Sequence, residues 1–331
     1  MESGETIAGS KGDPVVIPLS EVHEAPGPYT MSFGFDIGPM VRSIERVGVL
    51  NRPVVERDGD GNVHIIAGYR RLMALKALQC GEACCTDLTA AGLPFLQKLL
   101  LGLYDNLVAR GFNDVEKAMI LERLLPCVPR AELLSVYMPI LGLPCHEPLL
   151  ETYLLIPRLR VETRQALARK QISLQTIRLL LDMDQDTREV VSDWLLKMRF
   201  SINYQREVID YITDISHRDG LSVRQVLSDE GLMTLLHGET RNQPQRIKAV
   251  LDVLRQRRFP TLARAERTFR DRISGLGLPP DAGITHPPGF ESGGYRLEVR
   301  FSDGEALRET LLEIASLEGL KDLGAPWKKP A

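Results

Sequence analysis

The first ninety residues alternate short β-branched runs with amphipathic stretches, which predicts a mixed domain of strands and helices. Runs rich in Val and Ile predict strands at 15–19, 53–56 and 63–67. Residues 58–62 read Asp-Gly-Asp-Gly-Asn, a strong hairpin signal between the last two strands. Apolar residues recur at helical spacing over 37–47, with Gly48 placed as a C-cap glycine. A second helix is predicted over 70–78.

From about residue 95 the apolar spacing is helical almost throughout. Candidate helices are 93–109, 114–125, 130–139, 146–155, 161–169, 173–181, 186–198, 203–217, 222–230, 243–257 and 261–274. Residues 275–294 contain six Gly and four Pro, which predicts a linker or long loop. Alternation over 295–301 then predicts a half-buried strand, followed by an amphipathic helix over 305–318.

This order of elements predicts the α+β class, with strands at the front, helices in the middle and one strand-turn-helix unit at the end. We expect five segments along the chain: a mixed N-terminal domain, a helical domain, a basic helical arm, a linker and a small C-terminal module. Their expected bounds are 14–112, 113–240, 241–274, 275–294 and 295–325.

Composition is that of an ordinary globular chain and favours the cytoplasm. The 331 residues carry 41 Lys+Arg and 44 Asp+Glu, a formal net charge of −3. No apolar run approaches the roughly 20 residues that span a bilayer, so we expect no membrane association. Five cysteines are an odd number and argue against a disulfide scaffold. The acidic N-terminus lacks the features of a secretory signal.

The net charge conceals a strongly basic segment, which reopens the question of nucleic-acid binding. Residues 241–272 hold ten basic and three acidic residues. Such density on two helices favours contact with a phosphate backbone, although solvated faces or an acidic protein partner are alternatives. The DNA-contact candidates are Arg255, Arg257, Arg258, Arg264, Arg267 and Arg270.

The stretch 64–74 has the composition of an anion site. A strand ends in Gly68 and leads directly into a helix whose first turn carries Arg70 and Arg71. Free N–H groups and the helix dipole favour an anion at such a turn, and arginine adds forked donors. The alternative is that Gly68 only makes a turn and both arginines face water.

A second stretch, 104–118, adds oxygen ligands. Asp105 and Asn106 are of the kind that holds Mg²⁺ beside nucleotide phosphates, and Arg110 follows. Asn113 and Glu116 then mark a capped helix start. The alternative is a helix end followed by a capped helix, with no ligand.

Taken together, these segments resemble the N-terminal domain of the ParB family of DNA-partition proteins over about residues 14–120. The resemblance lies in the Gly-x-x-x-x-Pro-Val-Val region after the first helix, in Gly68-Tyr69-Arg70-Arg71, and in Asp105-Asn106-x-x-x-Arg110 before an Asn-x-x-Glu helix. It implies a ParB/sulfiredoxin-like fold that binds cytidine triphosphate (CTP), or another nucleotide, with Mg²⁺ and clamps on DNA. The implied phosphate contacts are Gly68, Tyr69 (backbone), Arg70 and Arg71. Asp105 and Asn106 would hold the metal or phosphate, with Arg110 in support.

The resemblance also implies a nucleoid-associated homodimer that acts in plasmid or chromosome partition or mobile-element regulation, with a partition ATPase as a further partner. The chain departs from the family at three places. The family usually has Glu where Asp105 stands and often Arg where Met73 stands, and residues 28–34 replace an Arg-containing segment. These departures affect the expected hydrolysis of CTP, for which the protein would be at most a weak CTPase, more than they affect the expected fold.

Residues 131–155 fit a helix-turn-helix, with 141–144 as the turn. Its second helix contains no Lys or Arg, the usual readers of base edges together with Asn and Gln. The segment fits equally well a helical packing element that is inherited from a DNA-binding domain.

Two other function classes stay open beside DNA partition. The same anion turn suits a ParB-like nucleotide-dependent kinase, and a nucleotide-free scaffold or regulator would need only the fold. Thiol chemistry of the sulfiredoxin kind is disfavoured, because Tyr69 stands where that chemistry needs Cys. Cys80, Cys84 and Cys85 lack a second ligand pair at zinc spacing, which favours free thiols. The C-terminal module serves either dimerisation or packing.

Overall fold

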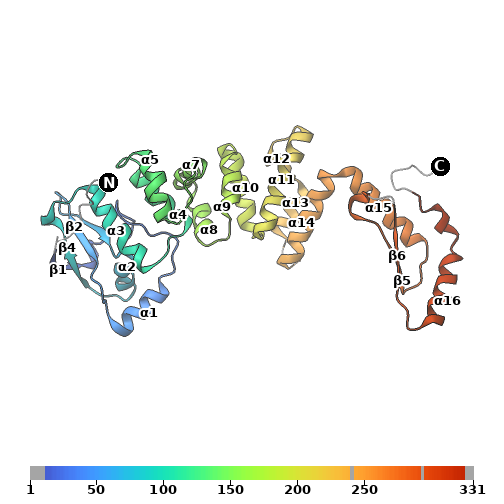
Figure 1. The fold of residues 1–331 in the computed structure, drawn as a ribbon, viewed down its shortest axis with the longest axis horizontal. Helices are drawn as coiled ribbons and strands as arrows, with labels where there is room; N and C mark the ends of the chain where they lie inside the picture. Colours follow the sequence, from blue (N-terminus) through green and yellow to red (C-terminus); the bar gives the residue numbers. More distant parts are fainter. Residues whose placement is uncertain (1–11, 239–241, 292–293, 325–331) are drawn as a thin grey trace. The chain divides into compact units, whose positions relative to one another are not determined.

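The computed structural model describes residues 12–238, 242–291 and 294–324 (Figure 1). The chain divides into two compact units, residues 1–206 and 207–331. The first contains a sheet with helices and then a helical region, and the second contains helices and a two-stranded sheet. This arrangement confirms the predicted α+β class. Among the described residues, no helix is both long and apolar enough to cross a membrane.

The sheet of the first unit has four strands in the order β1-β4-β2-β3. They are β1 (Asp13–Pro18), β2 (Val54–Arg57), β3 (Val63–Ala67) and β4 (Glu82–Asp87). β2 and β3 form the predicted antiparallel hairpin. β4 lies between β1 and β2, antiparallel to the first and parallel to the second.

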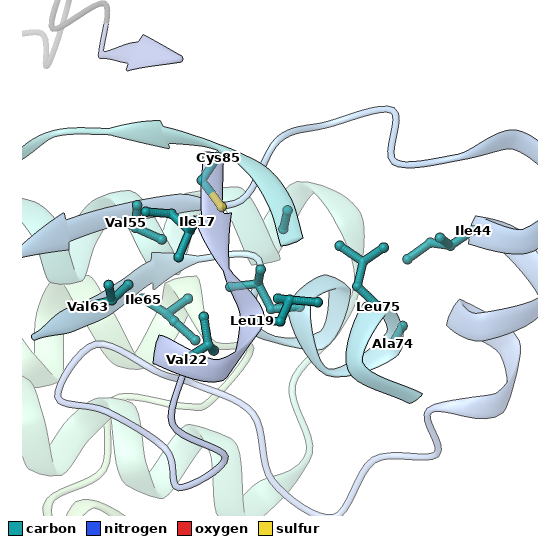
Figure 2. Close-up of a cluster of buried hydrophobic side chains, with 12 residues drawn as sticks. Ile17, Leu19, Val22, Ile44, Val55, Val63, Ile65, Ala74, Leu75 and Cys85 are labelled. Atoms are coloured by element: carbon teal, nitrogen blue, oxygen red, sulfur yellow. The ribbon is translucent and has the colours of Figure 1, made fainter. Parts of the chain in front are cut away.

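Three helices accompany this sheet: α1 (Gly38–Val47), α2 (Tyr69–Ala77) and α3 (Phe95–Ala109). Gly48 ends α1 with a φ of 71° and donates its N–H to Ile44, as the C-cap pattern predicts. A buried cluster joins β1, the hairpin, β4, α1 and α2 (Figure 2). Its largest members include Ile17, Leu19, Val55, Ile65, Leu72 and Leu75. This core fixes where β3 ends and α2 begins.

The remaining helices of the first unit match the predicted segments closely. They are α4 (Asp114–Leu124), α5 (Arg130–Glu132), η3 (Leu133–Tyr137), α6 (Met138–Ile140), α7 (Glu147–Leu155), α8 (Val161–Ala168), α9 (Leu174–Leu181) and α10 (Gln185–Met198). α5, η3 and α6 follow one another without a break, so the predicted helix 130–139 is continuous, with a π-helical stretch inside it. α11 (Ile202–Asp219) begins in the first unit and continues into the second.

The second unit continues with α12 (Val223–Leu227), α13 (Glu230–His237), α14 (Gln243–Arg258), α15 (Pro260–Gly275) and α16 (Gly304–Ala315). Its two strands, β5 (Ala282–Thr285) and β6 (Arg296–Val299), pair antiparallel. Phe269 of α15 packs with Ala265 and Phe290 in a small core that Ile284 of β5 joins.

The second unit differs from its prediction in three places. The predicted linker 275–294 contains β5, so that prediction is wrong for 282–285, where pairing with β6 and packing of Ile284 order the chain. The strand at 295–301 is shorter than predicted and not half-buried, since Leu297 and Phe301 are 44% and 57% exposed. A two-stranded ribbon offers little surface for alternating residues to pack against. α13 was not predicted as a separate helix.

Candidate functional site

The turn from β3 into α2 requires glycine. Gly68 has a φ of 88°, and a Cβ there would lie 2.9 Å from the Cα of Pro53. No side chain caps α2 in the part of the chain described. The first amide N–H groups of the helix, at Tyr69 and Arg70, therefore have no intrahelical acceptor and suit an anion.

A cavity of about 270 Å³ lies beside this turn. The structure brings together around it every residue that the sequence singled out for nucleotide binding. These are Gly68, Tyr69, Arg70, Arg71, Asp105, Asn106 and Arg110, from α2, α3 and its C-terminal end. The rest of the lining consists of Tyr29, Thr30, Met31, Ser32, Met40, Ile65, Ile66 and Ala67. The lining thus combines three arginines with several apolar side chains.

Arg71 bridges two parts of the cavity wall. Its Nη1 donates to the Asn51 carbonyl at 2.7 Å, and its Nη2 meets Asp105 Oδ2 at 2.9 Å. Its Nε has no recorded acceptor among the described residues. The ion pair links α2 to α3, and its Asp105 side chain is 43% exposed.

Arg70 and Arg110 converge on one buried carboxylate. Glu116 is 1% exposed and accepts from Arg70 Nη2 at Oε1 and from Arg110 Nη1 at Oε2, both at 2.7 Å. Both guanidiniums also donate to Ser32 Oγ, at 3.3 and 3.1 Å. Burial, and then the charge of Arg110, lower the pKa of Arg70, while Glu116 opposes the shift. The ring of Phe35 lies 4.5 Å below the Arg70 guanidinium.

The two arginines differ in the donors that they leave free. A guanidinium has five N–H groups, and those of Arg110 all have acceptors within the protein. They are Asn106 Oδ1 for Nε, Gly111 O and Glu116 Oε2 for Nη1, and Met31 O and Ser32 Oγ for Nη2. Arg70 has no recorded acceptor for Nη1 among the described residues. The geometry therefore suits Arg70 for ligand contact and Arg110 for support.

The predicted metal ligands are engaged to different degrees. Asn106 uses both side-chain atoms, since its Nδ2 donates to Gly102 O and its Oδ1 accepts from Arg110. Asp105 uses Oδ2 for Arg71 and has no recorded partner at Oδ1 among the described residues. Mg²⁺ is commonly held by one or two carboxylates together with substrate phosphates and waters. Asp105 therefore fits such a metal, and Asn106 fits a role in holding Arg110. Among the described residues, no three His, Cys, Asp or Glu side chains gather as a metal site.

Sequence reasoning missed two features of this site. Ser32 lies in residues 28–34, which the sequence singled out only because they replace an Arg-containing segment of the family, and no motif indicated that its hydroxyl would meet two arginines. Glu116 was recognised as a helix-start residue, and it does complete a capping box with Asn113. Its spacing gave no sign of the long-range contacts to Arg70 and Phe33.

The predicted helix-turn-helix segment consists of the 130–140 helix, a turn and α7. Gly142 in the turn has a φ of 71°. α7 buries Leu150, Thr152 and Tyr153. Its exposed acidic residues, Glu147 and Glu151, pair with Arg130. The outer face of α7 is therefore acidic, which does not suit base reading by α7 alone.

The six arginines predicted to contact DNA divide into two groups. Three are paired: Arg255 with Glu266, Arg257 with Asp219 and Asp229, and Arg258 with Asp214. The other three are exposed on α15 and have no ion-pair partner in the described ranges: Arg264, Arg267 and Arg270. Of the six predicted contacts, only these three offer exposed side chains without an ion pair in the described ranges.

Comparisons with known proteins give structural likeness only. No protein-family model matches the chain, and no curated protein matches it. The solved structures similar to it include the C-terminally truncated chromosome-partitioning protein ParB from Caulobacter crescentus complexed with CTP-gamma-S. That alignment has 18% identity and a TM-score of 0.26, and it covers 56% of this chain and 99% of the other. The same truncated protein complexed to the centromeric parS site aligns with 15% identity and a TM-score of 0.32, over 59% and 98%. Both TM-scores are below 0.5, so neither alignment identifies this chain.

Proposed function

We propose that this chain is a ParB-like DNA-binding protein whose N-terminal domain binds a nucleoside triphosphate, with CTP as the first candidate. The observation that carries the proposal is the cavity itself. Seven residues that the family resemblance singles out, from two stretches more than thirty positions apart, line one cavity at the N-terminus of α2. Glu116 and Asp105 balance the three arginines only in part, because two carboxylates face three guanidiniums, and the remaining positive charge favours an anionic ligand.

The cavity lining suits both parts of a nucleotide. The N–H groups at the start of α2, with Arg70 and Arg71, offer donors to phosphate oxygens. Tyr29, Met40 and Ile65 add apolar surface to the lining, which suits a base or ribose face. Mg²⁺ bound through Asp105 Oδ1 would neutralise phosphate charge there.

DNA is the second partner in this proposal. Arg264, Arg267 and Arg270 are exposed on α15 and have no ion-pair partner among the residues that the structure describes. Contacts of this kind read the phosphate backbone rather than base sequence, and they weaken as salt rises. In this proposal the protein is a homodimer on the nucleoid and works with a partition ATPase. It acts in plasmid or chromosome partition or in mobile-element regulation.

Calorimetric titration of the full chain with CTP, ATP and GTP, with and without Mg²⁺, tests the nucleotide claim. We expect saturable heat with one nucleotide, strengthened by Mg²⁺. If none of the three nucleotides gives binding heat, the nucleotide proposal is wrong. Measuring released phosphate in the same samples separates binding from hydrolysis.

A further inference from the structure

The Glu116 carboxylate is held from four directions. Oε1 accepts from the Phe33 N–H at 3.1 Å and from Arg70, and Oε2 accepts from the Asn113 N–H at 3.1 Å and from Arg110. The carboxylate is thus fixed both to its own helix and to the 30–35 segment. Because the carboxylate accepts four hydrogen bonds and is 1% exposed, it is firmly held in this orientation.

Glu116 lies behind the arginines rather than in the cavity. The described lining includes Arg70, Arg110 and Ser32 but not Glu116. A bound phosphate would therefore meet the guanidinium of Arg70 and not the carboxylate. Because one carboxylate serves two guanidiniums, the trio carries a net positive charge next to the cavity.

Three side chains fix the direction of Arg70. Glu116 takes one Nη2 hydrogen, Ser32 takes Nε, and the ring of Phe35 lies against the guanidinium plane. This leaves Nη1 without a recorded acceptor in the described structure. Without the carboxylate, Arg70 and Arg110 would repel each other across the remaining Ser32 hydroxyl.

We infer that Glu116 is a positioning residue for phosphate binding, acting through Arg70 without touching the ligand. The inference rests on the proposed nucleotide function. Arg110 completes the arrangement by neutralising the second carboxylate oxygen. Glu116 thereby prepares Arg70 for the ligand before the ligand arrives.

A double-mutant cycle on the full chain tests this inference, with CTP and Mg²⁺ as the probe. Glu116→Gln keeps the shape of the side chain and removes its charge. In the wild-type background we expect CTP affinity to fall about tenfold, the effect of losing one charge-assisted hydrogen bond. In the Arg70→Ala background the same substitution should change the remaining affinity less than twofold, because its target is gone. Glu122→Gln, on the exposed side of the same helix, serves as the matched control.

The outcomes separate a positioning role from a merely structural one. A structural role would weaken binding equally in both backgrounds, and that result would overturn the inference. Tighter binding by Glu116→Gln would also overturn it, because the carboxylate would then be competing with the phosphate. If Glu116→Gln fails to fold, Glu116→Asp replaces it in the cycle, since it keeps an anion in the first turn of α4 but falls short of the arginines. Failure of the wild-type chain to bind CTP, ATP or GTP would instead reject the proposed function, and if ATP or GTP binds in place of CTP, that nucleotide becomes the probe of the cycle.

Discussion

Replacing Gly68 by alanine tests the backbone geometry on which the candidate site depends. An L-residue in the left-handed region costs about 1–2 kcal/mol. The added Cβ would also lie 2.9 Å from Pro53 Cα and 3.0 Å from Pro53 Cβ, and overpacking of this kind costs about 1–3 kcal/mol. We therefore expect Gly68→Ala to lower the free energy of unfolding by about 2–5 kcal/mol.

Gly61 provides the matched comparison, because it separates conformation from contact. Its φ is 83°, close to the 88° of Gly68, but a Cβ there would meet nothing within 4 Å. Gly61→Ala should cost only the conformational part, about 1–2 kcal/mol. Urea unfolding of both variants, followed by circular dichroism, gives the difference. Equal destabilisation by the two substitutions would refute the claim that close approach to Pro53 makes glycine necessary at this turn.

Three further predictions concern DNA contact and buried polar groups. Replacing the exposed Arg264, Arg267 and Arg270 of α15 by alanine should reduce the slope of log K for DNA against log salt by about 2.7. Alanine replacement of the paired Arg255, Arg257 and Arg258 should change this slope by less than about 1. Equal effects on the slope would contradict the division between free and paired cations. Gln205 is 1% exposed, and its side chain has four hydrogen-bond partners. The substitution Gln205→Leu should therefore lower the free energy of unfolding by about 3 kcal/mol. Thr30→Val should leave the thermal midpoint within about 2 °C, because the buried hydroxyl has no partner among the described residues, and a larger drop would show a missed hydrogen bond.

Local signals predicted the part of the fold that local chemistry determines. The hairpin at 58–62 and the end of α1 at Gly48 follow from turn and cap residues, which act over a few positions. β4 was missed because Glu-Ala-Cys-Cys-Thr-Asp lacks a β-branched run. Its order depends on pairing with β1 and β2, far away in the sequence. β5 was missed for the same reason, since its partner lies beyond a Gly- and Pro-rich segment.

In the candidate site, too, the sequence indicated the residues of local motifs but not the contacts between distant segments. The sequence singles out Gly68, Arg70 and Arg71 because a glycine followed by arginines at a strand-to-helix turn is typical of an anion site, although a plain turn with arginines facing water has the same sequence. The contacts of Glu116 with Arg70, 46 positions away, and with Phe33, 83 positions away, cannot be read from spacing. Nor can the pairing of half the predicted DNA-contact arginines with acidic neighbours, since Asp214 and Arg258 meet only when α11 and α14 pack.

The central claim is that Arg70 and Arg71 hold the phosphates of a nucleotide at the start of α2. The most direct test compares the calorimetric affinity for CTP with Mg²⁺ of the wild-type chain, the Arg70→Ala/Arg71→Ala double variant and the surface control Arg46→Ala. We predict that the wild type and the control bind alike and that the double variant, still folded by circular dichroism, loses at least a hundredfold in affinity, about 1.4 kcal/mol for each factor of ten. Unchanged affinity in the folded double variant would contradict the account.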